Sequence, residues 1–234
     1  MCSTVSVVRP VSIVKDEDAL PDGFFKQWKN KHLDEPAFLL GSGPTINHFP
    51  VSKHKGVYVG VNDIHIHPKI KDKLNYLITE KNHPELRNLP DELPVFHHDR
   101  VELDKPNSFK CFRNLSEWGG PFYGSHVKAE PRCCHAPLRD FTEQIGAVSM
   151  IYLGLFFCLH IGCRRIYLVG CDCSSGNKFS KSLEAGTYGF YANVWKRVGE
   201  YVKQTHPDVE ITNINPVNLE GVFPSIYSSE DDGT

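Results

Sequence analysis

The chain lacks an apolar run long enough to cross a bilayer, which takes about 20 residues. The longest candidate, Met150 to Ile161, falls short of that length and predicts a buried helix instead. The first residues also lack a basic segment followed by an apolar core, so they do not predict a signal peptide. These two absences predict a cytoplasmic protein with no integral membrane segment.

An excess of charge of one sign is missing as well. The 26 basic and 28 acidic residues give a formal net charge of −2, which gives no general reason to expect nucleic-acid binding. Without a secretory leader, the eight cysteines predict reduced thiols rather than a disulfide framework. What remains is a globular composition whose length suits one α/β domain, with or without a sizeable insertion.

Short apolar runs alternate with helical segments along most of the chain. Strands are expected at 37–40, 57–61, 74–79, 93–96, 165–170 and 209–213, and helices at 23–32, 144–161 and 188–204. Such an alternation predicts an α/β fold with a mainly parallel sheet and helices on both faces.

The strongest local signal is the segment Phe38–Thr45, where an apolar run ends in a Gly-x-Gly turn. Gly41 and Gly43 permit a close backbone approach, and Pro44 suits the first turn of a helix. A glycine turn at a helix N-terminus points N–H groups at one spot, which favours an anion such as a phosphate. A tight turn without a ligand is the alternative.

Polar residues follow several of the expected strands. Carboxyl ends of parallel strands share one edge of the sheet, where ligands bind at the point at which the strand order reverses. We therefore expect a cleft at this edge, although an aspartate after a strand can also simply cap a turn. The residues that would line it are Gly41, Ser42, Gly43, Asn62, Asp63, Thr79, Glu80 and Asp172.

Several blocks between residues 36 and 225 form one ordered pattern. The blocks are Gly41–Thr45, Val59–Asn62, Gly146–Ser149, Leu159–Asp172 and Ile214–Pro224. The pattern is similar to the superfamily that includes bacterial lipo-oligosaccharide sialyltransferases and the hydroxymethylpterin pyrophosphokinase-like proteins of the DUF115 type. The resemblance implies a Rossmann-like sheet that binds a nucleotide or a nucleotide-activated donor.

The resemblance also implies roles for individual residues. Asn62 would contact the nucleotide or the donor group, and Asp172 would contact the ribose, a substrate hydroxyl or a metal ion. The donor phosphate would be cradled by Gly41, Ser42, Gly43, Pro44 and Thr45. The phosphates or the sugar would be covered by Gly146, Ala147, Val148 and Ser149 at the N-terminus of their helix.

The chain departs from the sialyltransferases at the catalytic base. Those enzymes carry a histidine in the segment after the Gly-x-Asp strand, whereas residues 174–195 contain none. Tyr188, Tyr191 and Lys196 are the nearest candidates, and each needs a shifted pKa to act as a base near neutral pH. Asp172 and Tyr188 are the predicted catalytic residues.

Histidines and cysteines raise a further question of metal binding. His65-x-His67 would place two rings on the same side of a strand, as in a metal pair, the alternative being partly exposed loop histidines. One of the histidines in this part of the chain, which also holds His83, His97 and His98, could supply the missing base if it approaches the acceptor. Cys158 and Cys163 are expected to be core thiols. The spacing of Cys133-Cys134-His135 and Cys171-x-Cys173 is poor for zinc, so no metal site is predicted.

Three segments complete the domain organisation. Residues 1–35 are an N-terminal extension, and residues 228–234 are a polar, frayed tail. Residues 36–227 are expected to form a single Rossmann-like nucleotide-binding domain with an irregular insertion at about 99–140. This insertion fits either a functional lid or a surface loop without a role.

Three functions remain open. The favoured one is a transferase with a nucleotide-activated donor, above all a sialyltransferase-like glycosyltransferase that uses a CMP-sugar or another nucleotide-sugar. The second is magnesium-dependent pyrophosphoryl transfer from ATP to a small hydroxymethyl compound, with Asp172 or Glu80 as a metal ligand. The third is a nucleotide-binding protein without chemistry. No tightly bound cofactor is expected; the partners are the donor and a small-molecule or glycan acceptor, with magnesium and an oligomer left open.

Overall fold

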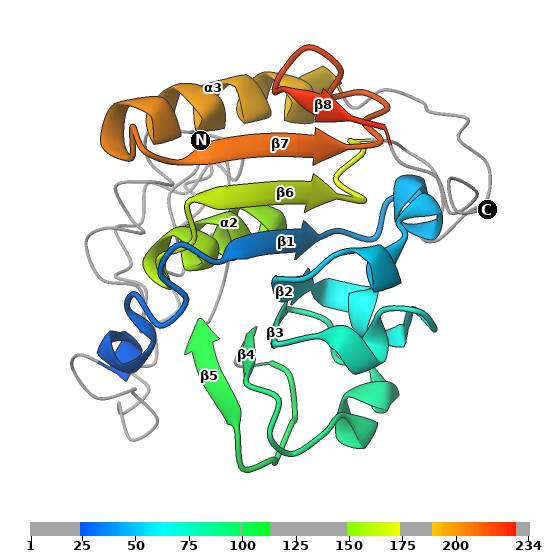
Figure 1. Cartoon of the computed structure of the whole chain (residues 1–234). Coiled ribbons are helices and arrows are strands. Elements are labelled where there is room, and N and C mark those ends of the chain that lie inside the picture. Colours follow the sequence, from blue (N-terminus) through cyan, green and yellow to red (C-terminus); the bar gives the residue numbers. More distant parts are fainter. Residues whose placement is uncertain (1–23, 99, 113–148, 174–188, 228–234) are drawn as a thin grey trace, which may run out of the picture.

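The computed structural model describes residues 24–98, 100–112, 149–173 and 189–227. Its strands form one sheet in the order β5-β4-β3-β2-β1-β6-β7-β8, and every pairing between neighbours is parallel (Figure 1). The strands are β1 (Pro36–Leu40), β2 (Val57–Val61), β3 (Tyr76–Thr79), β4 (Val95–His98), β5 (Ser108–Phe112), β6 (Arg165–Val169), β7 (Glu210–Ile214) and β8 (Ser225–Ile226).

The central strands are apolar on both faces because both faces are covered. Along β1, Ala37 and Leu39 point into one core, whereas Phe38 and Leu40 point into the other. Since side chains alternate along a strand, one continuous apolar run supplies both cores.

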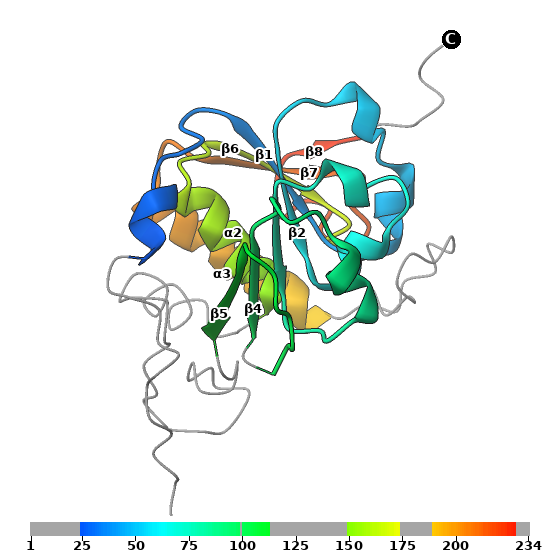
Figure 2. The ribbon, with the colours of Figure 1, turned by 90° about the horizontal axis from the view of Figure 1, so that it is seen from below.

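One face of the sheet carries the α-helices (Figure 2). They are α2 (Met150–His160) and α3 (Gly189–Thr205), with the short 3-10 helix η1 (Phe24–Trp28) beside them. Gly154 brings α2 close to the sheet, because a Cβ at that position would lie 2.5 Å from Leu39 Cδ1. The buried side of α3 is formed by Val194, Val198, Tyr201 and Val202.

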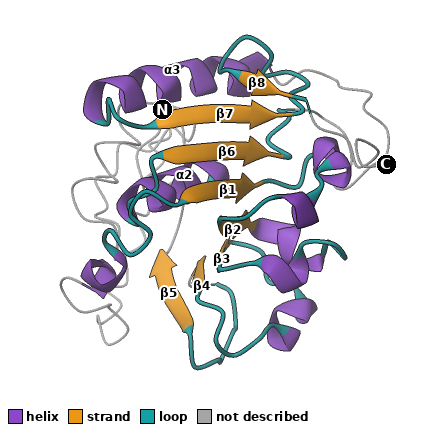
Figure 3. Ribbon diagram, in the orientation of Figure 1, coloured by secondary structure: helices purple, strands orange, loops and turns teal. Residues whose placement is uncertain are grey.

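The other face is covered by short 3-10 turns instead of α-helices (Figure 3). Pro44 and Pro84 open two of them, as suits the first position of a helical turn. The predicted α/β fold with helical layers on both faces is thus confirmed, with one layer made of 3-10 turns. These turns are η2 (Pro44–His48), η3 (Val51–Lys53), η4 (Asn62–Ile66), η5 (Lys71–Lys73) and η6 (Pro84–Asn88).

Two strands were missing from the expected pattern. β5 lies inside the predicted irregular insertion, and β8 follows the strand predicted to be the last. Both are edge strands of the sheet, which need fewer apolar residues than buried ones, and β8 is only two residues long. Residues 113–140 of the insertion and 144–148 of the expected helix lie outside the described residues.

The segment before β1 fixes the direction of α2. The N–H groups of Asn30, His32 and Asp34 donate to the carbonyl oxygens of residues 160–162 at 2.8 to 3.2 Å. The end of α2 therefore lies near the amino ends of the strands, and its beginning lies at the carboxyl edge of the sheet. In the described ranges, no helix combines the length and the apolar character that crossing a membrane requires.

Candidate functional site

The strand order reverses between β1 and β6. From β1 the chain proceeds outward through β2 to β5, whereas β6 pairs with the other side of β1 and leads to β7 and β8. Leu40 is level with Val169 at the ends of these two strands. We call the segments that follow, Gly41–Gly43 and Gly170–Cys173, the switch-point loops. In open α/β sheets, ligands bind outside the strand ends at such a point.

The switch-point loops touch each other through glycines. Gly41 N–H donates to Val169 O at 2.8 Å, and Gly43 N–H donates to Gly170 O at 2.9 Å. A Cβ at Gly41 would lie 2.4 Å from Gly170 O, and one at Gly170, where φ is +65°, would lie 2.4 Å from Gly41 O. The glycines predicted to approach a phosphate therefore approach the opposite loop.

Asp172 places a carboxylate at the start of η2. Thr45 N–H donates to Asp172 Oδ2 at 2.9 Å, and the Thr45 hydroxyl donates to Asp172 Oδ1. A Cβ at Gly43 would lie 2.3 Å from Asp172 Oδ2, so the missing side chain makes room for the carboxylate. Burial raises the pKa of Asp172, and the hydrogen bonds from Thr45 act against that rise. Asp172 therefore occupies the position in which an anion was predicted, as the cap of the turn after β1.

The ends of β2 and β3 are also joined by predicted residues. Asn62, in the left-handed conformation with φ +50°, accepts a hydrogen bond from Glu80 N–H on its Oδ1 at 3.1 Å. The Glu80 carboxylate forms an ion pair with Arg100 at 3.1 Å. Arg100 was not predicted from the sequence as a residue of this edge of the sheet. Asp63 and Thr79 are buried beside them, and the Thr79 hydroxyl accepts from Lys81 N–H at 3.0 Å.

The beginning of α2 lies at the same edge. Ser149 is its N-cap residue, and its side chain forms no capping hydrogen bond. A Cβ at Gly154 would lie 3.0 Å from Val61 Cγ1, which places the first turns of α2 over the end of β2. The N–H groups of a first helical turn have no partner within the helix and carry the positive end of its dipole. The predicted residues Gly146, Ala147, Val148 and Tyr188 lie outside the described residues.

Both carboxylates considered as magnesium ligands already bind other groups of the chain. Asp172 is 4% exposed and bound to Thr45, while Glu80 is paired with Arg100. No group of three metal-ligating side chains occurs among the described residues. A magnesium ion that bound either carboxylate would have to replace or share these contacts.

The histidines after β2 differ from both expectations. His65 and His67 lie in and just after η4 rather than on a strand, and they are 2% and 3% exposed. Their rings bind different partners, since His65 Nδ1 lies 2.8 Å from Asn62 O and His67 Nε2 lies 3.2 Å from Asn47 Oδ1. The strand and the partly exposed loop were both wrong, because the 3-10 turn and the residue that follows it direct these side chains inward.

The prediction that Cys158 and Cys163 are core thiols is confirmed. Cys158 and Cys163 are buried, and burial raises the pKa of both thiols. Cys171 contacts the carbonyl oxygens of Leu39 and Val169 through its sulfur. Residues 133–135 lie outside the described ranges.

Burial of His65 predicts a loss of stability in acid. Burial lowers its pKa, as does His83 more weakly, while the Asn62 carbonyl, Asp63 and Glu85 act in the opposite direction. The unfolded chain then takes up a proton that the folded state resists, so stability falls as the pH drops below about 6.5. We expect the melting temperature of His65→Asn to fall less steeply than wild type between pH 7 and pH 5. Equal slopes in thermal melts would contradict this.

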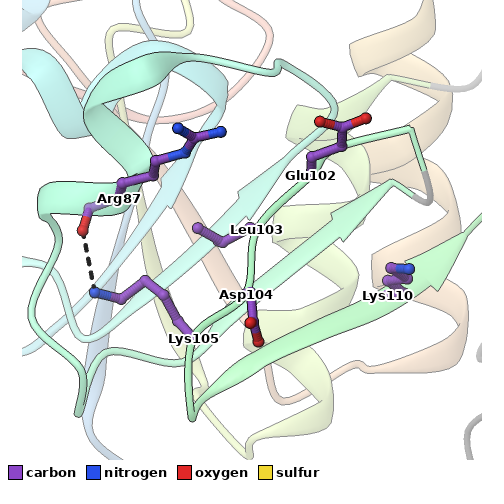
Figure 4. A pocket seen from close by; sticks show the side chains of 6 residues that line it. All are labelled: Arg87, Glu102, Leu103, Asp104, Lys105 and Lys110. Atoms are coloured by element: carbon purple, nitrogen blue, oxygen red, sulfur yellow. Dashed lines mark hydrogen bonds between the residues drawn. The ribbon is translucent and has the colours of Figure 1, made fainter.

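A hollow of about 640 Å³ lies away from this edge, between η6 and the connection from β4 to β5 (Figure 4). The Lys105 amine in it is held by Arg87 O and Asp91. Basic and acidic side chains are mixed in its lining, and none of the predicted site residues takes part. The lining residues are Arg87, Glu102, Leu103, Asp104, Lys105 and Lys110.

Comparison with known proteins finds similarity in structure only. No family model matches the chain, including one for the DUF115-type group, and no curated protein matches it in sequence. The structure of the MAf glycosyltransferase from Magnetospirillum magneticum AMB-1 is similar at 14% identity and a TM-score of 0.46, over 87% of this chain and 37% of that chain. The chain thus spans little more than a third of that protein.

Two structures of the sialyltransferase CstII from Campylobacter jejuni are similar as well. The complex with cytidine-5'-monophosphate aligns at 11% identity and a TM-score of 0.46, over 77% of this chain and 80% of that chain. The complex with CMP-3FNeuAc aligns at 10% identity and a TM-score of 0.43, over 76% and 79%. At these identities the likeness concerns the α/β fold alone.

Proposed function

We propose that the protein is a transferase of the glycosyltransferase kind that binds a nucleotide-activated donor at the carboxyl edge of the sheet. The observation that carries the proposal is the reversal of strand order between β1 and β6, with predicted polar residues gathered at the adjoining strand ends. Parallel α/β sheets bind ligands at this edge, and the blocks that resemble sialyltransferases contribute residues to it.

In this proposal the donor phosphates bind at the beginning of α2 rather than in the glycine turn. Asp172 already binds the Thr45 N–H, and its carboxylate would repel a phosphate there. Among the described residues, the candidate donors are the N–H groups of Met150 and Ile151 and the side-chain amide of Asn62, because Tyr152 N–H already donates to Ser149 O at 3.0 Å. Such groups stabilise the negative charge that develops on a departing nucleotide. Gly41, Gly43 and Thr45 then contribute indirectly. The two glycines let the switch-point loops approach each other, and Thr45 binds the Asp172 carboxylate.

The finer proposal is a CMP-sugar donor, as the sialyltransferase-like pattern implies. The absence of histidine from residues 174–195 favours one other candidate, a protein that binds the nucleotide without turnover. Magnesium-dependent pyrophosphoryl transfer is less favoured, because Asp172 binds Thr45 and Glu80 is paired with Arg100.

A thermal-shift panel with CMP, CDP, UDP, GDP, ADP and ATP, each with and without magnesium, tests the proposal. CMP at 100 times its dissociation constant should stabilise the protein by about 2.7 kcal/mol. For a chain of this size that corresponds to about 5 to 10 °C, and we expect the shift without magnesium. No shift with any nucleotide would contradict the proposal, and a shift with ATP and magnesium alone would favour pyrophosphoryl transfer.

A substitution of Asn62, at the carboxyl edge of the sheet, tests where the nucleotide binds. Asn62→Asp preserves the acceptor for Glu80 N–H but replaces the amide donor by a carboxylate, which repels a phosphate. We expect the CMP shift to disappear in this variant while the unliganded protein remains folded. Asn88→Asp makes the same change at an exposed position in η6 and should retain the shift. Equal shifts in both variants would place the nucleotide elsewhere.

A further inference from the structure

His65 has an unusual balance of hydrogen bonds for a buried side chain. Its Nδ1 lies 2.8 Å from the carbonyl oxygen of Asn62 and donates to it, because a carbonyl can only accept. The ring is 2% exposed, and its Nε2 has no hydrogen-bond partner among the described residues. The neutral ring therefore has its proton on Nδ1 and a buried lone pair on Nε2.

Packing alone does not account for a histidine in this position. A buried acceptor without a partner is unfavourable, and leucine would fill similar space without one. The His83 ring, 5.4 Å away and edge-on, gives His65 an aromatic neighbour but no hydrogen bond that would satisfy Nε2. What histidine provides and leucine cannot is the donor to Asn62 O.

Asn62 is the residue that this bond can stabilise. Its φ of +50° is uncommon for residues other than glycine. Both of its oxygens accept hydrogen bonds, the carbonyl from His65 Nδ1–H and the side-chain Oδ1 from Glu80 N–H at 3.1 Å. The side-chain NH₂ is the remaining donor, and it belongs to a half-buried residue at the carboxyl edge of the sheet.

We propose that His65 is a positioning residue that fixes Asn62 so that the Asn62 side-chain amide donates to an oxygen of the nucleotide donor. The inference rests on the proposed function for the identity of that ligand. The hydrogen bonds themselves exist in the protein without it, and this difference allows the two claims to be tested separately.

Two variants of His65 separate the hydrogen bond from the packing. His65→Asn places an amide NH₂ near the former Nδ1 and can still donate to Asn62 O, whereas His65→Leu cannot donate at all. His206→Leu, at a half-buried position just after α3, is the remote control. The readouts are hydrogen exchange of the Glu80 amide in the unliganded protein and the affinity for CMP by calorimetry.

In His65→Leu we expect the Glu80 amide to exchange at least about fivefold faster and CMP to bind about fivefold more weakly, the effect of one hydrogen bond. In His65→Asn both values should stay within about twofold of wild type. Unchanged Glu80 exchange in His65→Leu, or equal changes in both variants, would overturn the role of His65. Faster exchange in the leucine variant alone, with no CMP binding by wild type, would support that role and overturn the proposed function.

Discussion

The variant Gly43→Val is expected to melt about 10 °C below the wild-type protein, with a loss of about 3 kcal/mol in stability. A Cβ at Gly43 would lie 2.3 Å from Asp172 Oδ2 and 2.7 Å from Gly170 O. The second of these atoms belongs to the backbone and cannot rotate away. The added side chain therefore forces the switch-point loops apart and removes the contacts between them.

Thermal unfolding followed by circular dichroism measures the effect. Gly199→Ala in α3 is the matched control, because the atoms nearest to its Cβ would belong to the Phe223 ring, the closest at 3.0 Å, and alanine favours a helix. This control should melt within about 2 °C of wild type. A Gly43→Val protein that melts with the control would show that the loops are not packed as described. Loss of nucleotide binding in Gly43→Val alone says nothing about phosphate contacts, since packing already explains it.

Asp172→Ala is expected to cost about 2 kcal/mol, or about 6 °C in melting temperature. The substitution leaves the N–H and hydroxyl of Thr45 buried without their acceptors, and Thr45 is only 3% exposed. Removal of a carboxylate whose pKa is raised by burial offsets part of that cost. The net loss should appear in chemical denaturation as a lower midpoint with an unchanged slope.

Asp172→Asn separates hydrogen bonding from charge. Its amide oxygen can accept from Thr45 N–H while its NH₂ donates to the Thr45 hydroxyl, so we expect a loss below about 1 kcal/mol. Because the pKa of Asp172 is raised, the folded wild type holds a proton more tightly than the unfolded chain does. The stability of wild type relative to Asp172→Asn should therefore increase as the pH falls toward 3.8. A loss in Asp172→Asn as large as in Asp172→Ala would mean that the negative charge itself is required.

The sheet could be predicted because buried parallel strands are continuous apolar runs. β2 is found at the predicted residues, Val57–Val61, and β6 ends one residue earlier than predicted. The 3-10 turns were not predictable in the same way. Asn62 begins η4 in a left-handed conformation, and its side chain accepts from the N–H of Glu80, the residue after the neighbouring strand β3.

The composition of the candidate site was easier to predict than its arrangement. Thr45 and Asp172 were both assigned to it, each as a contact to a ligand. Their hydrogen bonds to each other join residues 127 positions apart, and no local pattern marks such a pair. His65 was misjudged for a different reason, because its partner is the carbonyl of its own turn.

The pairing of β1 with β6 has a consequence for the order of folding. β1 to β4 follow one another along the chain and pair as neighbours, whereas Pro36 must find Arg165 across the whole intervening sequence. Contacts of such long sequence separation carry the largest loop-closure entropy and tend to form late. We therefore expect substitutions in the switch-point loops to accelerate unfolding and leave the refolding rate nearly unchanged. A chain under thermal stress would then open first between β1 and β6, while the half of the sheet from β2 to β5 remains assembled.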